Sequence, residues 1–299
     1  MAGREIDAIR ALLSAKPRPM GWAERRRRLD EVGSHWPAAG DVKLESADVA
    51  GLPGEWSMAP GSAAGDVLLF FHGGGYCSGS ILSHRSMVTE AGRAAGVRTL
   101  AVGYCLAPEH KFPAALDDAL AAWRFLRGQG IAPGRIAVGG DSAGGGLTLV
   151  LANRLRGSGE DGPACLWLAS PWTDLTMSGA TLATRESVDP LIHKPYLEEL
   201  AEAYLPPAFD RRDPRVSPLF ADLRGSPPTL IQVGSAETLL ADATRLAEAA
   251  GVAEVAVTLE VWPEMIHAWP LWNAALEPGR RALAHAGAFI RRHLATAST

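Results

Sequence analysis

The sequence contains few cysteines and no excess of positive charge. Its three cysteines, Cys77, Cys105 and Cys165, form no C-x-x-C pair, so neither a disulfide framework nor a metal site is predicted. The 29 Lys and Arg residues are outnumbered by 33 Asp and Glu residues, which leaves a net charge of −4. Proteins that bind the nucleic-acid backbone are normally basic, so we expect no nucleic-acid partner.

Long apolar runs are also absent from the sequence. No segment approaches the roughly 18 apolar residues of a membrane span. Residues 1–7 carry charges where a signal peptide needs an apolar stretch. The hydrophobic content of 47% and the charged content of 21% are typical of an ordinary globular domain. We therefore expect a cytoplasmic protein without a stable membrane anchor.

Short apolar segments alternate with helical patterns along most of the chain. This alternation predicts an α/β fold, with a mostly parallel sheet of at least six strands and helices on both faces. Strands are predicted at residues 67–71, 98–104, 136–139, 166–170, 230–234 and 255–262, and an antiparallel edge at 42–44 and 55–58. Helices are predicted at residues 114–127 and 239–250, the second closed by Gly251 in the left-handed conformation.

Two regions depart from this alternation, and together they predict a lid. Residues 1 to about 38 hold an amphipathic helix, whose apolar residues are Ile6, Ile9, Leu12 and Leu13. Residues 180–206 are rich in Leu, Tyr and Pro. The arginine run at residues 25–28 is interpreted as a solvated helix face, because the chain as a whole is acidic.

A serine lies in a glycine-rich turn between a predicted strand and a predicted helix. Residues 138–146 read Val-Gly-Gly-Asp-Ser-Ala-Gly-Gly-Gly, which places Ser142 in the G-x-S-x-G pattern of a nucleophile elbow. The alternative is a tight turn without chemistry, which the flanking strand and helix disfavour. A phosphate loop would need Lys-Ser or Lys-Thr where Gly145-Gly146 stand.

A serine nucleophile needs a histidine base and an orienting carboxylate later in the chain. Of the eight histidines, only His267 lies just beyond the last predicted strand. Glu237 follows the preceding strand by three residues and is the predicted acid. Asp242 is the competing acid, but it falls inside a helical stretch, where it would favour the positive end of the helix.

Glycines also follow the first strong strand, in His72-Gly73-Gly74-Gly75. Successive glycines allow backbone N–H groups to approach an oxyanion closely. We therefore predict an oxyanion hole made of the N–H groups of Gly73, Gly74 and Ala143. His72 is expected to brace this loop by hydrogen bonding rather than to act as a base.

Taken together, these motifs resemble the bacterial hormone-sensitive lipase family (family IV) of esterases, within the α/β-hydrolase superfamily. The resemblance covers roughly residues 40–295. Its motifs are residues 72–75 (HGGG), 104–110 (YCLAPEH), 112–115 (FPAA), 140–144 (GDSAG), 170–174 (SPWTD), 217–219 (SPL) and His267.

The resemblance implies an α/β-hydrolase fold with an eight-stranded, mostly parallel sheet, a helical cap, no cofactor and hydrolysis of short-chain esters. Residues 1–40 are then the N-terminal part of the cap, and residues 41–299 the catalytic domain with a cap insertion at about 180–206. Two positions depart from the family pattern. Cys105 stands where the family often has Arg, and Glu237 stands where many members have Asp.

We therefore expect a serine carboxylesterase with catalytic residues Ser142, Glu237 and His267, acting on a small-molecule ester through an acyl-enzyme. A lactone hydrolase or a small-molecule deacetylase using the same triad is the first alternative. A non-catalytic binding protein on the same fold is the second, disfavoured by the presence of His267. A homodimer is compatible with the resemblance, although the sequence shows no distinctive oligomerisation signal.

Overall fold

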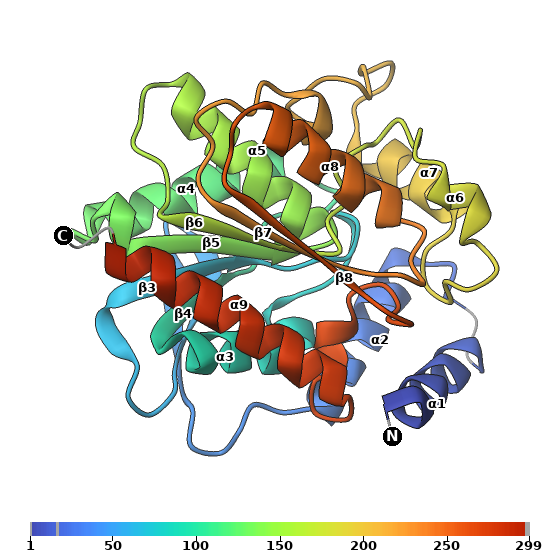
Figure 1. The fold of residues 1–299 in the computed structure, drawn as a ribbon, viewed down its shortest axis with the longest axis horizontal. Coiled ribbons are helices and arrows are strands. Elements are labelled where there is room, and N and C mark those ends of the chain that lie inside the picture. The colour runs from blue at the N-terminus through green and yellow to red at the C-terminus, as the bar shows by residue number, and fades with distance from the viewer. Residues whose placement is uncertain (1, 16–17, 297–299) are drawn as a thin grey trace.

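The computed structural model describes residues 2–15 and 18–296 and is built around one eight-stranded sheet with the strand order β1-β2-β4-β3-β5-β6-β7-β8 (Figure 1). β1 and β2 pair antiparallel, as do β2 and β4, and the other neighbours are parallel. The strands are β1 (Lys43–Val49), β2 (Leu52–Met58), β3 (Ala63–Phe71), β4 (Val97–Val102), β5 (Ile136–Asp141), β6 (Cys165–Ala169), β7 (Thr229–Gly234) and β8 (Val257–Trp262).

Helices cover both faces of this sheet. Figure 1 shows α3 and α9 below it and α4, α5 and α8 above it. The helices are α1 (Ala2–Ser14), α2 (Trp22–His35), α3 (Ile81–Ala95), α4 (Ala114–Gly128), α5 (Ala143–Gly157), α6 (Thr181–Thr184), α7 (Lys194–Tyr204), α8 (Leu240–Val252) and α9 (Glu277–Thr296). This arrangement confirms the predicted α/β-hydrolase fold with a mostly parallel sheet.

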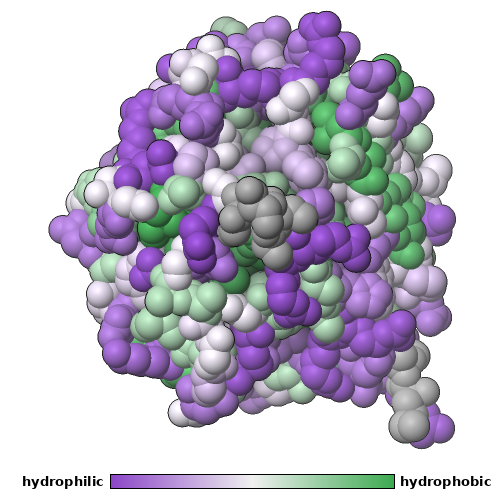
Figure 2. All heavy atoms as spheres, turned by 60° about the vertical axis from the view of Figure 1, so that its left-hand side comes forward, coloured by the Kyte–Doolittle hydropathy of each residue, from purple (hydrophilic) through white to green (hydrophobic). Residues whose placement is uncertain are grey.

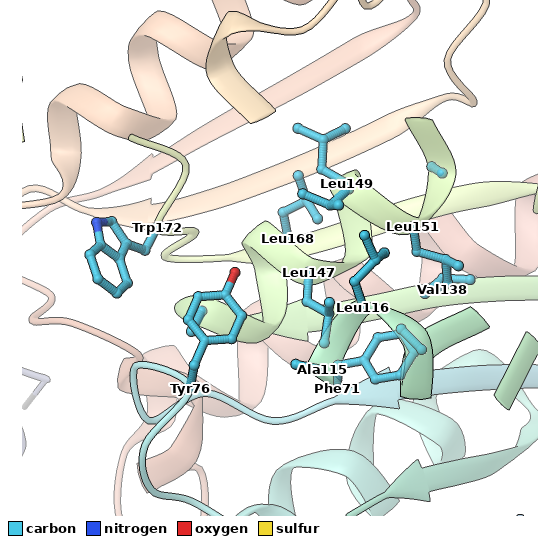
Figure 3. Close-up of a cluster of buried hydrophobic side chains, with 14 of the residues drawn as sticks. Phe71, Tyr76, Ala115, Leu116, Val138, Leu147, Leu149, Leu151, Leu168 and Trp172 are labelled. Carbon is cyan, nitrogen blue, oxygen red and sulfur yellow. The ribbon is translucent and has the colours of Figure 1, made fainter. Parts of the chain in front are cut away.

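The central strands are apolar because both of their faces are covered. Every residue of β5, β6 and β7 is buried, as expected for parallel strands between two helical layers. Side chains alternate between the layers: Leu168 packs with α4, α5 and α8, whereas Trp167 packs with α3 and α9. Figure 3 shows the first of these clusters, with Val138 and Leu168 of the sheet facing Leu147 and Leu151 of α5.

Each predicted strand overlaps a strand of the structure, although β1 and β3 are longer than predicted and β8 is shorter. The predicted end of the helix at 239–250 is wrong. α8 continues to Val252, and Gly251 is not left-handed. The left-handed residue is Glu254, with φ of 58°. The chain turns there because the Val255 N–H bonds back to the carbonyl of Ala250 and the Val255 side chain becomes buried.

The N-terminal helices lie outside the sheet and pack on different surfaces. In α1, Ile6 and Ile9 are buried against a cluster that includes Trp269, whereas Leu12 is 51% exposed. α2 packs closely on α3, where a Cβ at Gly33 would overlap the backbone of the other helix.

Two residues of the arginine run at the start of α2 differ from the predicted solvated face, whereas Arg27 is exposed as predicted. Arg25 is only 6% exposed and pairs through Nη2 with Glu199 of α7 at 2.9 Å. Arg26 pairs with Glu109 at 2.7 Å and donates to two backbone carbonyls. These two side chains face inward because the fold brings their partners beside α2. The partners are 174 and 83 residues away in the sequence.

The surface carries no broad apolar face in the view of Figure 2, where hydrophobic residues form small, separate patches among hydrophilic ones. Among the described residues, no helix combines the length and the hydropathy needed to cross a bilayer.

Candidate active site

Ser142 occupies a strained turn between β5 and α5. Its φ of 53° and ψ of −121° lie in a region that side-chain-bearing residues rarely adopt. The turn is possible because glycines flank it: a Cβ at Gly140 would overlap the carbonyl of Gly144, and a Cβ at Gly144 would overlap that of Phe71. The Ser142 N–H donates to Ala169 at 2.9 Å. The elbow therefore places Ser142 at the carboxyl edge of the sheet.

The structure brings Glu237 and His267 into direct contact at the same edge. Glu237 follows β7, His267 follows β8, and Glu237 Oε2 lies 3.1 Å from His267 Nδ1. The other carboxylate oxygen, Oε1, accepts the Gly234 N–H at 2.6 Å and the Ser170 hydroxyl at 2.7 Å. Glu237 is fully buried and His267 is 5% exposed. Each oxygen of the carboxylate therefore has a defined partner.

The surroundings of this pair favour a protonated imidazole. Burial raises the pKa of Glu237 above its ordinary value, although the hydrogen bonds from His267, Ser170 and Gly234 oppose the rise. Burial by itself would lower the pKa of His267. The hydrogen bond and the charge of Glu237, with smaller contributions from Asp189 and Asp141, outweigh burial and raise it. An imidazole with a raised pKa is suited to accept a proton.

No hydrogen bond joins the Ser142 hydroxyl to the His267 imidazole in the described part of the chain. The charges of His267 and of Asp141, the residue before Ser142, act on one another. Contacts of this kind are often loose without substrate and tighten when it binds.

Asp242, the competing acid, bonds elsewhere. Its Oδ2 accepts the N–H groups of Thr173 at 2.8 Å and Asp174 at 2.9 Å. Complete burial raises its pKa to about 7. Asp242 therefore holds the loop after β6. Asp174 stabilises the next part of this loop by accepting the Thr176 N–H at 2.9 Å.

The glycine loop after β3 differs from its prediction at Gly73. The Gly73 N–H donates to Asp141 Oδ1 at 2.9 Å, so it is engaged by a buried carboxylate rather than free for an oxyanion. Gly74 and Gly75 are left-handed, with φ of 108° and 65°. Among residues 2–15 and 18–296, no acceptor bonds to either of their N–H groups. The Ala143 N–H, in the first turn of α5, has no partner within the helix either.

Two histidines support the glycine loop. His72 Nδ1 lies 2.8 Å from the Gly73 carbonyl, and its ring stacks on Tyr104. His84 Nε2 lies 3.2 Å from Asp141 Oδ1. Sequence reasoning expected the bracing role of His72 but missed that of His84, which is 57 residues from its partner.

Residues of the 180–206 segment lie against this loop. Tyr204 of α7 stacks on Tyr76, with ring centroids 4.0 Å apart. A Cβ at Gly75 would overlap the side chain of Leu200. Figure 3 shows Tyr76 and Trp172 near one another beside α5. Within the described ranges, no group of three His, Cys, Asp or Glu side chains is arranged to hold a metal ion.

Comparison with known proteins points to one family. The model of the alpha/beta hydrolase fold family matches residues 68–271. The chain is similar to the acetyl-hydrolase of Streptomyces hygroscopicus, with 40% identity over 298 residues that cover 97% of each protein. It is also similar to the ethyl acetate hydrolase of Pseudomonas putida, with 35% identity covering 85% of this chain and 82% of the relative.

A solved structure supports the same assignment. The crystal structure of an esterase from the bacterial hormone-sensitive lipase family superimposes with a TM-score of 0.94 at 40% identity, covering 97% of this chain and 98% of the other. The chain therefore belongs to the α/β-hydrolase fold family, within the bacterial hormone-sensitive lipase group of ester hydrolases.

Proposed function

We propose that the protein is a serine carboxylesterase that hydrolyses short-chain acyl esters with the triad Ser142, His267 and Glu237. The observation that carries the proposal is the buried 3.1 Å contact between Glu237 Oε2 and His267 Nδ1, at the sheet edge where the strained turn presents Ser142. A serine hydroxyl becomes a competent nucleophile only beside such an oriented base.

The reaction follows from the roles of these groups. His267 Nε2 takes the proton of the Ser142 hydroxyl while Oγ forms a bond to the ester carbonyl carbon. The tetrahedral intermediate collapses when the protonated His267 gives its proton to the departing alcohol. Water then attacks the acyl-enzyme with His267 again as base, which releases the carboxylic acid and restores Ser142. Glu237 stabilises the imidazolium in both halves of the cycle.

We propose that the oxyanion is held by the N–H groups of Gly74, Gly75 and Ala143. Gly73 is replaced by Gly75 in this set, because the Gly73 N–H already donates to Asp141. The N–H groups of Gly74 and Gly75 are without partners among the described residues, and left-handed glycines bring the backbone close to a ligand. Losing one such donor typically costs on the order of 10²- to 10³-fold in rate.

The preference for short acyl groups rests on how closely α7 covers the site. Ser142 is 7% exposed, and Leu200 and Tyr204 of α7 pack on the glycine loop. We propose that residues 1–40 and 180–206 form the cap whose packing limits the acyl chain. Two relatives named for acetyl and ethyl acetate hydrolysis support this size class.

A p-nitrophenyl ester series tests the proposal. We expect hydrolysis of the acetate and the butyrate, and much slower hydrolysis of the octanoate and the palmitate. Ser142→Ala should lower kcat/KM by at least about 10⁴-fold. Ser158→Ala is the matched control, because Ser158 ends the same helix, α5, at its exposed end. A wild-type protein inert to all four esters, or an active Ser142→Ala variant, would refute the proposal.

A deacetylase is the second candidate, favoured by the name of the Streptomyces relative. It uses the same triad and differs only in the alcohol released. Hydrolysis of acetylated small molecules more than about tenfold faster than that of p-nitrophenyl acetate, with the same dependence on Ser142, would favour this candidate.

A further inference from the structure

The backbone next to the triad acid is held by side chains of the 180–206 segment. The Thr238 N–H donates to Asp189 Oδ2 at 2.9 Å. The Thr238 carbonyl accepts the Thr181 hydroxyl at 2.7 Å. Thr238 is fully buried and directly follows Glu237. The position of the acid therefore depends on two side chains that lie outside the sheet.

Asp189 uses both of its carboxylate oxygens in this arrangement. Oδ2 also lies 3.1 Å from the Thr238 hydroxyl, while Oδ1 accepts the N–H groups of Leu191 at 2.9 Å and Ile192 at 3.0 Å. Asp189 is only 6% exposed. Hydrogen bonds to a charged and buried acceptor are among the stronger ones in proteins. One carboxylate thus joins the loop that carries Glu237 and Thr238, here called the acid loop, to the turn that leads into α7.

The same segment reaches the glycine loop through α7. His193 Nδ1 accepts the Tyr196 N–H at the start of this helix. Leu200, further along, leaves no space for a Cβ at Gly75, and its carbonyl lies 3.9 Å from Cys77 Sγ. A displacement of α7 would therefore move the acid loop and the glycine loop together.

Asp189 also acts on the histidine through its charge. The groups that raise the pKa of His267 are Glu237, which bonds to it, and then the carboxylates of Asp189 and Asp141 at longer range. Burial opposes all three. Removal of the Asp189 charge should therefore lower the pKa of His267.

We propose that Asp189 is a positioning residue, a role that rests on the proposed esterase function. By holding Thr238, Asp189 fixes the orientation of Glu237 toward His267. It also couples that orientation to the position of α7. Asp189 touches no reacting atom in this scheme. Its effect passes through the backbone of the loop that carries Glu237 and through its charge, which acts on His267 at longer range.

Asp189→Asn tests the proposal. Its side-chain NH₂ group must face either the N–H of Thr238 or the N–H groups of Leu191 and Ile192, so one of these hydrogen-bond sets is lost. We expect kcat for p-nitrophenyl acetate to fall on the order of 10- to 100-fold, the size of effect that a small misplacement of a reacting group produces. KM should change little. The acid limb of the kcat/KM profile should move to lower pH, because His267 then loses its proton more readily.

Asp213→Asn is the matched control. Asp213 is also a loop carboxylate that accepts a backbone N–H, from Arg215 at 2.8 Å, but its charge is paired with the same arginine. This variant should keep the wild-type profile. Counting active sites with a phosphonate inhibitor separates a slower site from a smaller folded fraction, because only a slower site lowers kcat per titrated serine.

Thr181→Val is the second variant if Asp189→Asn does not fold. It releases the Thr238 carbonyl, together with the Ala241 N–H that Thr181 Oγ1 accepts at 2.8 Å, without changing charge or size. It should lower kcat per titrated serine in the same direction. Unchanged kcat and an unchanged acid limb in the folded variants would overturn the positioning role. An inert wild-type protein, or an active Ser142→Ala variant, would instead overturn the esterase proposal itself.

Discussion

Replacing Glu237 with glutamine changes the charge of this side chain while keeping its shape. In the structure, Oε1 faces the Gly234 N–H at 2.6 Å, and Oε2 faces His267 Nδ1 at 3.1 Å. The Gly234 N–H can only donate, so a glutamine must place its oxygen there. Its NH₂ group is then directed at His267 Nδ1.

An NH₂ group in that position imposes the wrong tautomer on the histidine. Nδ1 must then accept a hydrogen bond, so the ring proton moves to Nε2. A protonated Nε2 cannot take the proton of the Ser142 hydroxyl. An arrangement of this kind lowers kcat about 10⁴-fold in serine hydrolases. At about 1.4 kcal/mol for each factor of ten, this corresponds to about 5.5 kcal/mol of lost transition-state stabilisation.

The assay is kcat/KM for p-nitrophenyl acetate between pH 6 and 9, with thermal unfolding to show that Glu237→Gln remains folded. Asp242→Asn is the comparison, because Asp242 was the competing acid and bonds to the loop after β6. A loss of less than about tenfold in Glu237→Gln would refute the reasoning. A 10⁴-fold loss in Asp242→Asn alone would transfer the acid role to Asp242.

Two further predictions concern buried polar groups. Burial raises the pKa of Asp242 from 3.8 to about 7, so the folded state holds its proton more tightly than the unfolded state. The stability from this group is therefore full below its ordinary pKa and lost as pH rises through about 7. Chemical denaturation between pH 4 and 8 should show a steeper fall in the wild type than in Asp242→Asn, and equal slopes would contradict this. Trp167→Phe leaves Gln232 Oε1, now bonded to Trp167 Nε1 at 2.9 Å, without a donor. The free energy of unfolding should fall by about 1–3 kcal/mol or more, with the esterase rate per active site unchanged. A fall below about 0.5 kcal/mol would contradict the stabilising role of this hydrogen bond.

Features that depend on local sequence could be predicted well. The strands follow from short apolar segments, and Ser142 follows from a glycine-rich turn between a strand and a helix. Glu237 and His267 were selected because each lies just past a strand, and the carboxyl ends of parallel strands meet at one edge. The structure brings these two side chains into contact.

Features that depend on distant partners could not be predicted. The three glycines at residues 73–75 are equivalent in the sequence, and the bond that engages the Gly73 N–H comes from Asp141, 68 residues away. Arg25 reads as a surface residue until Glu199, 174 residues away, is brought beside it. Side-chain partners at this separation are set by tertiary packing, which no local pattern encodes.

The docking of α1 has a consequence for the order of events during synthesis of the chain. Ile6 and Ile9 are buried against Trp269, Trp272 and neighbouring residues near the C-terminus. A 13-residue helix is too short to be stable alone in water. The apolar face of α1 therefore stays uncovered during synthesis until the segment that holds Trp269 and Trp272 has been translated. The docking of α1 is thus a late step of folding, and its apolar face is open to aggregation until that step.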